Sequence, residues 1–341
     1  MARERIAYID FMKCMCIMLI VMYHIDHDFF DYFAPNLNNA LQAFRLPMYY
    51  FISGIFFKLY NGFADFTRRK VNNILVPFVF FVVVAYGFRG LEAGLRLAIG
   101  AQPIDISPVR LLEPFFLRYW ETTTPLWFLL SLFWVNIIFY LLQCVIKPLW
   151  GLLFATAVIS VAGYWMAQNK VMLPLMLDTS LVALPYFVLG WYMKRVKPLP
   201  STLHWNIFRV LLLCVAAVPI YRLTEFMNLH FQVLPAYWKV YILPFCAITT
   251  LYLACMALPR IPVLCNYGRY SLIILGTHPL LFLPIRSFCV LRLGMEPGVT
   301  LALVVFFLTM SLEWPLIWLL KTYAPRFTAQ QPFFKEGWKL R

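Results

Sequence analysis

Apolar segments of about 20 residues follow one another along the whole chain, and short polar connections separate them. An α-helix needs about this length to cross the hydrocarbon core of a bilayer, whereas the strands of a membrane barrel read as segments of about ten residues with alternating polarity. The pattern therefore predicts an all-α polytopic membrane protein with about ten transmembrane helices. The expected spans are 6–26, 40–60, 71–90, 125–146, 149–167, 173–193, 206–226, 237–258, 270–290 and 299–320.

The composition supports a membrane location and leaves little sequence for a second domain. Hydrophobic residues make up 62% of the chain and charged residues 13%, whereas about a quarter of the residues in soluble proteins are charged. The longest connection, 91–124, is expected to hold one amphipathic helix, and neither it nor the end of the chain can bury a core of its own. We therefore expect one transmembrane domain over 1–325 and a short cytoplasmic tail over 326–341.

The distribution of Lys and Arg predicts the orientation in the membrane. With the N-terminus inside, most basic residues fall in cytoplasmic segments, and the first outer loop, DHDFFDYFAPNLNN, has none. Both termini are therefore expected in the cytoplasm, in a multi-pass protein of a cell membrane, with the bacterial cytoplasmic membrane favoured. The net charge of +14 then follows mainly from topology, and no nucleic-acid partner is needed to explain it.

The first span carries polar residues that share one face. Lys13 and His24 bound the stretch KCMCIMLIVMYH, and eleven helical steps turn by about 1100°, so the two side chains project from nearly the same side with a rise of about 16 Å between them. Asp10, three residues before Lys13, falls on that face as well. A polar seam of this kind must face protein or water rather than lipid.

The cysteines and the histidine-rich loop start do not indicate a metal site. Seven of the eight cysteines lie in apolar spans and Cys265 lies in an internal loop, so all are expected to be buried free thiols. Cys14 and Cys16 point in different directions on a helix, and the HIDHD stretch lacks a second set of ligands. We therefore predict no bound metal.

Several segments, in order and spacing, resemble the membrane acyltransferase 3 family. The first span matches that family's Arg or Lys, ten residues, then His. The other matching segments are FRLPMYYFISGIFF (44–57), RRKVNNILVPF (68–78), PLWFLLSLFW (125–134), ALPYFVLGWYMKR (183–195) and NYGRYSLIILGTHP (266–279). The chain looks like a stand-alone member without an appended extracytoplasmic domain. It departs from the family at Arg-x-x-Arg, where Lys70 and Asn73 stand here, and its fourth helix lacks the Glu-Glu pair of one large branch.

The resemblance implies transfer of an acyl group, usually acetyl from acetyl-CoA, to a hydroxyl of a cell-envelope glycan or a lipid-linked glycan precursor. The implied partners are acyl-CoA, such an acceptor and membrane lipid. The chemistry fits His24 as the general base, because an imidazole with a pKa near 6.5 can take a proton from the acceptor hydroxyl. The alternative interpretation of His24 is a histidine that lies at the membrane interface without a catalytic role.

Cationic residues are the candidates for binding the donor. Lys13 is expected to place a charge in the donor path, as a second catalytic and cofactor-binding residue, although it can also pair with Asp10 or reach the interface. Arg68, Arg69 and Lys70 are predicted to bind CoA phosphates at the inner mouth, whereas topology alone also calls for a basic cytoplasmic loop.

The remaining predicted substrate-binding residues are Arg45, Asp10, Asn73, Trp127 and His278. Arg45 is expected near the outer end of the second span, within reach of His24, where it holds an acceptor or anchors at the headgroups. Trp127 fits close packing as well, and His278 fits a packed residue at a helix kink better than a second base.

Two other functional classes stay open. A secondary transporter or a flippase for a lipid-linked saccharide also has about ten helices with a few intramembrane charges, but it typically shows inverted repeats, which are not visible here. A non-catalytic membrane scaffold is the third interpretation. The sequence leaves the oligomeric state open, with a homodimer as one option.

Overall fold

A computed structural model of the protein describes residues 6–98, 100, 102, 104–116, 118, 124–196, 200, 202–258 and 261–335. The helices are α1 (Ala7–Ile25), α2 (Leu37–Arg45), α3 (Pro47–Ile55), α4 (Phe63–Lys70), α5 (Val76–Ala98), α6 (Glu113–Phe116), α7 (Trp127–Val145), α8 (Leu149–Gln168), α9 (Leu177–Met193), α10 (Leu203–Leu223), α11 (Tyr237–Ala257), α12 (Pro262–Arg269), α13 (Ser271–Leu293) and α14 (Val299–Tyr323). Nine helical segments within these residues are long and apolar enough to cross a membrane, which fits the predicted all-α membrane fold.

The prediction of one continuous span over 40–60 is wrong. The segment forms two helices of nine residues each, α2 and α3, which meet at Leu46. Pro47 is the first residue of α3, where its missing N–H leaves no hydrogen bond unmade. The split has a physical reason, since α2 carries Gln42 and Arg45, which are costly in lipid and lie buried among protein atoms here.

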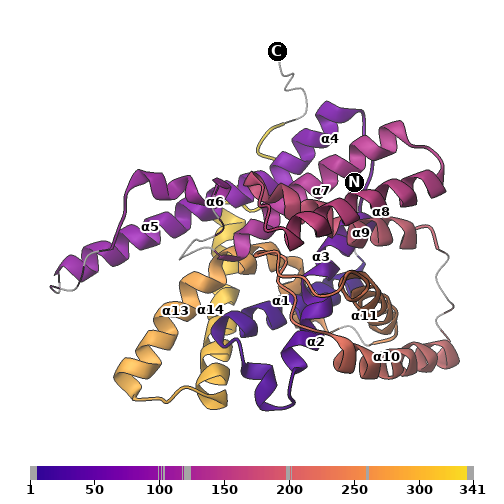
Figure 1. Ribbon diagram of the computed structural model, residues 1–341. Coiled ribbons are helices and arrows are strands. Elements are labelled where there is room, and N and C mark those ends of the chain that lie inside the picture. The colour runs from indigo at the N-terminus through magenta and orange to yellow at the C-terminus, as the bar shows by residue number, and fades with distance from the viewer. Residues whose placement is uncertain are drawn as a thin grey trace.

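The third span is longer than predicted, and the connection after it is simpler. A continuous helical segment runs over Phe63–Ala98, against the predicted 71–90. The amphipathic helix expected within 91–124 is wrong as well, because α5 continues to Ala98 and the described residues that follow it form only short turns, among them Pro108–Leu111 and α6. The far end of α5 reaches away from the other helices in Figure 1, and Leu97 is exposed there.

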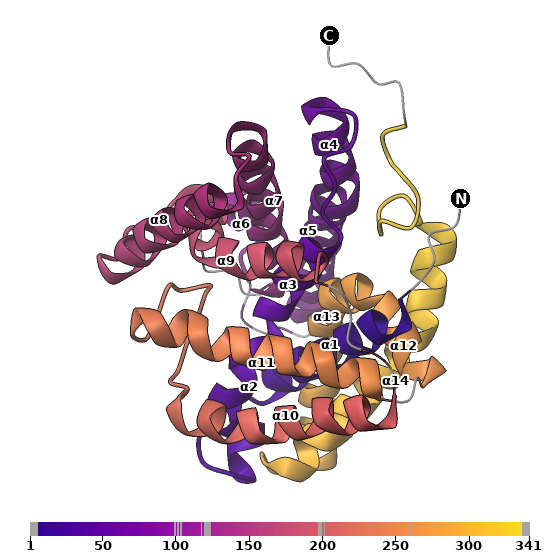
Figure 2. The ribbon, with the colours of Figure 1, turned by 90° about the vertical axis from the view of Figure 1, so that its right-hand side faces the viewer.

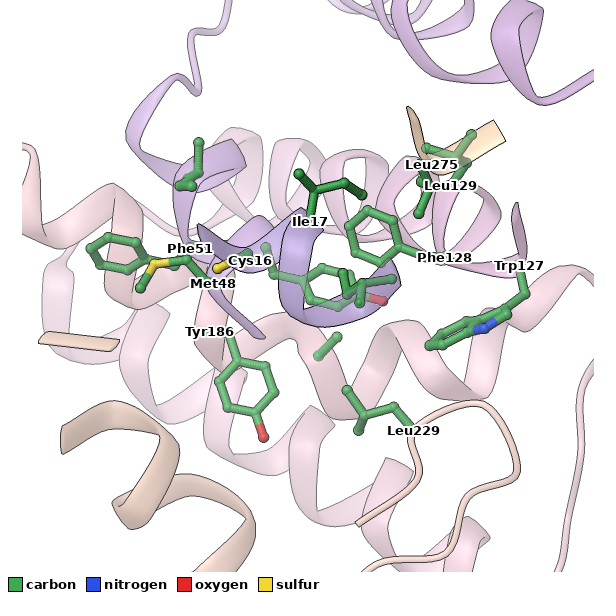
Figure 3. Close-up of a cluster of buried hydrophobic side chains, with 14 of the residues drawn as sticks. Cys16, Ile17, Met48, Phe51, Trp127, Phe128, Leu129, Tyr186, Leu229 and Leu275 are labelled. Atoms are coloured by element: carbon green, nitrogen blue, oxygen red, sulfur yellow. The ribbon is translucent and has the colours of Figure 1, made fainter. Parts of the chain in front are cut away.

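Helix α1 lies near the centre of the assembly. It contacts α11, α12, α13 and α14, and α10 runs beside α11 in both ribbon views (Figures 1 and 2). The core around α1 consists mainly of aromatic and branched side chains. Figure 3 shows Ile17 of α1 close to Phe128 of α7 within this cluster, with Met48 and Tyr186 nearby.

Two glycines let α3 and α9 pack with their backbones in contact. A Cβ atom at Gly54 would overlap the carbonyl oxygen of Phe187, and one at Gly190 would overlap that of Phe51. Small residues allow this close approach in membranes, where helix association depends on packing rather than on a hydrophobic force between helices. The helix pair is therefore held by contacts that any larger residue would break.

The eight cysteines are free thiols, but the prediction that all are buried is wrong for three of them. Cys144, Cys214 and Cys246 are exposed on the helix surface. They lie in apolar spans, and an apolar residue of a membrane helix can face lipid instead of the core.

A π-helical turn, Val71–Leu75, joins α4 to α5. Such turns are wider than α-helical ones and recur at functional sites. Its two asparagines point to different places. Asn72 is buried against Phe334, whereas Asn73 lines a cavity that Lys13 also lines.

The last described residues, 324–335, fold back on this long helix. The side-chain amide of Asn72 donates to the carbonyl oxygen of Phe334 at 2.9 Å and accepts from the Phe334 N–H at 2.8 Å. The Arg68 guanidinium donates to the carbonyl oxygen of Lys335 at 3.2 Å. We refer to 324–335 as the C-terminal strap.

Candidate active site

The polar residues of α1 line two cavities on one side of the helix. Lys13 lines a cavity of about 180 Å³, which we term the Lys13 cavity, and His24 lines one of about 330 Å³, the His24 cavity. Ile20 of α1 lines both. The seam predicted from spacing is present, and Lys13 forms an ion pair with Asp10 at 3.7 Å.

A backbone contact fixes the orientation of the His24 ring. Its Nδ1 atom lies 2.7 Å from the carbonyl oxygen of Ile20. Because a carbonyl oxygen only accepts hydrogen bonds, Nδ1 carries the proton in this bond and the lone pair of the neutral ring is on Nε2. The ring is therefore arranged to accept a proton at Nε2.

His278 packs against His24 from α13. The two ring centroids are 5.2 Å apart in an edge-to-face arrangement, and Nδ1 of His278 lies 2.7 Å from the carbonyl oxygen of Ile274. His278 is fully buried, and its Nε2 atom has no hydrogen-bond partner among the described residues. Pro279 follows it in α13, and the ring of His278 contacts that of His24, the candidate base.

The Arg45 guanidinium lines the His24 cavity from the end of α2. It donates to Oδ1 of Asn38 at 3.0 Å and lies over the ring of Tyr23, 3.8 Å from its centroid. Asn38 is held in turn by the carbonyl oxygen of His27 at 2.8 Å and by the carboxylate of Asp31 at 2.9 Å. The prediction that Arg45 lies near His24 is confirmed by this shared cavity.

Trp127 and His230 form a stacked pair at the same cavity. Their ring centroids are 4.9 Å apart and their planes differ by 5°. The loop that carries His230 is fixed by Arg118, which donates to the His230 carbonyl oxygen, and by Thr179, which donates to that of Leu229 at 3.1 Å. Burial, followed by the nearby Arg118 cation, lowers the pKa of His230 to about 3.

The Lys13 cavity is bounded by α1, α3, the π-helical turn, α7 and α13. Asn73 lines it together with Lys13, and the Tyr49 hydroxyl donates to the carbonyl oxygen of Lys13 at 3.0 Å. Like Ile20, the residues Leu46 and Leu275 line both this cavity and the His24 cavity. These three apolar residues therefore lie between the two cavities, and we term them the neck.

The basic segment before the π-helical turn is engaged with one carboxylate. Arg68 and Arg69 both form ion pairs with Asp65, the latter at 3.1 Å. The Lys70 ammonium lies 5.3 Å from the centroid of the Phe66 ring.

A comparison with known protein families decides the affiliation of the chain. Residues 6–318 match the family model described as an acyltransferase domain, acyltransferase 3. The chain belongs to the acyltransferase 3 family. No curated protein and no solved structure matches it. Membership makes this chain a membrane acyltransferase, as the resemblance of its sequence segments implies.

The predicted site residues of this acyltransferase 3 member lie in three places. His24, Arg45 and Trp127 line the His24 cavity, and His278 lies beside it. Lys13 and Asn73 line the Lys13 cavity, and Asp10 pairs with Lys13. Arg68, Arg69 and Lys70 lie on the helical segment that leads to Asn73, and they do not line either cavity.

Gln42 and His230 are two of the polar residues at the His24 cavity that the sequence-based prediction missed. Gln42 lies one helical turn before Arg45, and a second polar residue at this spacing inside an expected span was a readable signal. His230 had no such signal, because its place over Trp127 depends on a loop that Arg118 holds from a distant part of the chain.

Proposed function

We propose that this acyltransferase moves an acetyl group from acetyl-CoA to a hydroxyl of a cell-envelope glycan or a lipid-linked glycan precursor. The donor enters from the cytoplasmic side through the Lys13 cavity, and the acceptor binds in the His24 cavity. Orientation, donor and acceptor are those expected from the sequence, and the cavities support this division of roles.

The observation that carries the proposal is the neck shared by the two cavities. Ile20, Leu46 and Leu275 line both, so the space at Lys13 and the space at His24 adjoin the same three apolar residues. The helical rise between these two residues is about 16 Å, a distance that calls for a long, thin donor arm. An apolar neck suits the uncharged part of such an arm, whereas the charged headgroup stays at the Lys13 side.

His24 supplies the base for the transfer. The acceptor hydroxyl oxygen attacks the thioester carbon while Nε2 of His24 takes the hydroxyl proton, and the resulting tetrahedral intermediate then releases the CoA thiolate. The imidazolium returns its proton to the thiolate sulfur, which regenerates the neutral base. One C–S bond is broken and one C–O bond is formed, so the step needs no further reactant.

Cations at the inner side bind the donor phosphates in this proposal. Lys13 and Asn73 contact the part of the donor that occupies the Lys13 cavity. Arg68 and Arg69 pair with Asp65 when no donor is present, and a phosphate group offers them stronger bidentate contacts than one shared carboxylate does.

The test is a transfer assay on purified protein in detergent. With radiolabelled acetyl-CoA, an acyltransferase binds the donor and releases CoA as the acetyl group passes to water or to an added acceptor. A transporter or flippase leaves the thioester intact. Absence of both binding and thioester cleavage in folded protein would reject the proposal.

A further inference from the structure

Arg45 is a buried cation without a carboxylate partner in the part of the chain that the structure describes. Arg45 is 4% exposed. None of the ion pairs among the described residues includes it. Asp31, the acid closest to it in the hydrogen-bond network, accepts from the backbone N–H of Asn38 instead. The partners of Arg45 are the neutral Asn38 amide and the Tyr23 ring.

An unneutralised buried charge is unfavourable and calls for an anion. Arginine keeps its proton at any physiological pH, so it cannot avoid the cost by becoming neutral. Buried charges in proteins are normally paired, and removal of one partner from a buried pair is strongly destabilising. Arg45 lines the His24 cavity, and none of the described residues that line it is an Asp or a Glu, so the negative charge can come from a ligand.

Two neutral residues at the same cavity each have one polar atom without a hydrogen-bond partner among the described residues. Gln42 donates through its amide nitrogen to the carbonyl oxygen of Met227, which leaves its Oε1 atom unpaired, and the Nε2 atom of His230 is unpaired as well. Both residues are buried and line the cavity. An unpaired amide oxygen and an unpaired imidazole nitrogen, on residues that line a cavity, are suitable partners for hydroxyl groups.

We propose that the acceptor is an anionic saccharide. A carboxylate or phosphoester group of this saccharide binds Arg45, and its hydroxyl groups bind Gln42 and His230, next to the hydroxyl that His24 deprotonates. The inference rests on the proposed function for the transfer step, but the anion site itself does not. A carboxylate belongs to an acidic sugar of a glycan and a phosphoester to a sugar phosphate or a lipid-linked saccharide.

The first experiment measures acceptor selectivity. Three soluble probes are compared at equal concentration with purified protein and acetyl-CoA: methyl glucuronide, glucose 1-phosphate and neutral methyl glucoside. We expect kcat/KM for at least one anionic probe to exceed that for the neutral one by about ten- to a hundredfold, the worth of one charge-assisted hydrogen-bond set. The anionic probe with the higher kcat/KM shows whether the anion is a carboxylate or a phosphoester.

Variants assign the selectivity to Arg45. Arg45→Gln is expected to bring the anionic and neutral probes within about threefold of each other, and Arg45→Lys to restore part of the preference because the charge returns without the planar fork. Arg222→Gln, at an exposed position on α10, is the matched control and should keep the full preference. If Arg45→Gln lowers kcat equally for all three probes with KM unchanged, Arg45 acts on the reacting oxygen atom and the anion site is rejected.

A second measurement does not depend on turnover. Ligands that bind the folded state raise the unfolding temperature, so each probe is added to detergent-solubilised protein at high concentration. We expect stabilisation by an anionic probe and not by methyl glucoside, and loss of this difference in Arg45→Gln. Stabilisation by an anionic probe in folded protein that neither binds acetyl-CoA nor cleaves its thioester would reject the proposed function and keep the anion site. Equal responses to charged and neutral probes in the unsubstituted protein would reject the anion site, whatever the transfer assay shows.

Discussion

Substitution of His24 by Asn separates the proposed base from the packing around it. The Asn amide nitrogen can occupy the position of the imidazole Nδ1 and keep the donation to the Ile20 carbonyl oxygen, which is 2.7 Å in the protein. The substitution removes Nε2, the atom proposed to take the proton, together with the ring carbon Cε1, and places the amide oxygen at the position of Cδ2. The variant therefore tests chemistry with little change in the shape or anchoring of α1.

The expected loss can be worked out from the surroundings of the ring. A positioned general base contributes about 10²- to 10⁴-fold to a rate. His278 cannot replace His24, because it is fully buried and does not line the His24 cavity. We therefore expect the upper part of that range, about 10³- to 10⁴-fold in kcat, or about 4 to 5.4 kcal/mol at about 1.36 kcal/mol per factor of ten. Donor affinity should stay within about twofold, since the donor headgroup binds on the Lys13 side of the neck.

The assay follows acetylated product by mass spectrometry and measures acetyl-CoA binding separately on the same preparation. His204→Asn is the control, because His204 is exposed on α10 and lies outside both cavities. Thermal unfolding in detergent checks that both variants are folded. A folded His24→Asn protein that keeps more than about a tenth of the original kcat would refute His24 as the base.

Three further predictions concern the donor, the helix packing and pH. Lys13→Ala should raise KM for acetyl-CoA and lower kcat, whereas Lys13→Arg should keep much of the affinity; unchanged donor kinetics would contradict the donor path. Gly190→Ala should lower the free energy of unfolding by about 1–3 kcal/mol, measured by thermal unfolding in detergent, because its Cβ overlaps the Phe51 carbonyl oxygen. The folded-state pKa of His230 is about 3, against an ordinary value of 6.5, so the contribution of its neutral ring to the free energy of unfolding is complete above about pH 6.5. Stability should fall by about 1.4 kcal/mol per pH unit from there down towards pH 3, and His230→Phe should flatten that slope in unfolding curves; an unchanged slope would remove His230 as the cause.

The features that the sequence predicted best are those that depend on one helix at a time. The length of an apolar run sets a span, and the spacing of Lys13 and His24 sets a common face, because both follow from helical geometry alone. The same reasoning failed over 40–60, where hydrophobicity averaged over the segment hid a break at Leu46. A short polar helix and a short apolar helix in sequence look like one span of intermediate polarity.

Features that depend on the packing of several elements could not be predicted from the sequence. The neck combines Ile20 of α1, Leu46 at the junction of α2 and α3, and Leu275 of α13, and no local pattern connects them. His278 illustrates the same limit. Its place before Pro279 can be read from the sequence, but its contact with His24 depends on the packing of α13 against α1.

The C-terminal strap changes where the acyltransferase unit should be considered to end. The family match stops at residue 318, inside α14, yet Asn72 makes both of its amide hydrogen bonds to Phe334. A fragment trimmed at the family boundary would leave this buried amide without partners, next to the π-helical turn that places Asn73 in the Lys13 cavity. Helix register at one end of the proposed donor path is thus secured by residues that a boundary drawn from family resemblance leaves out.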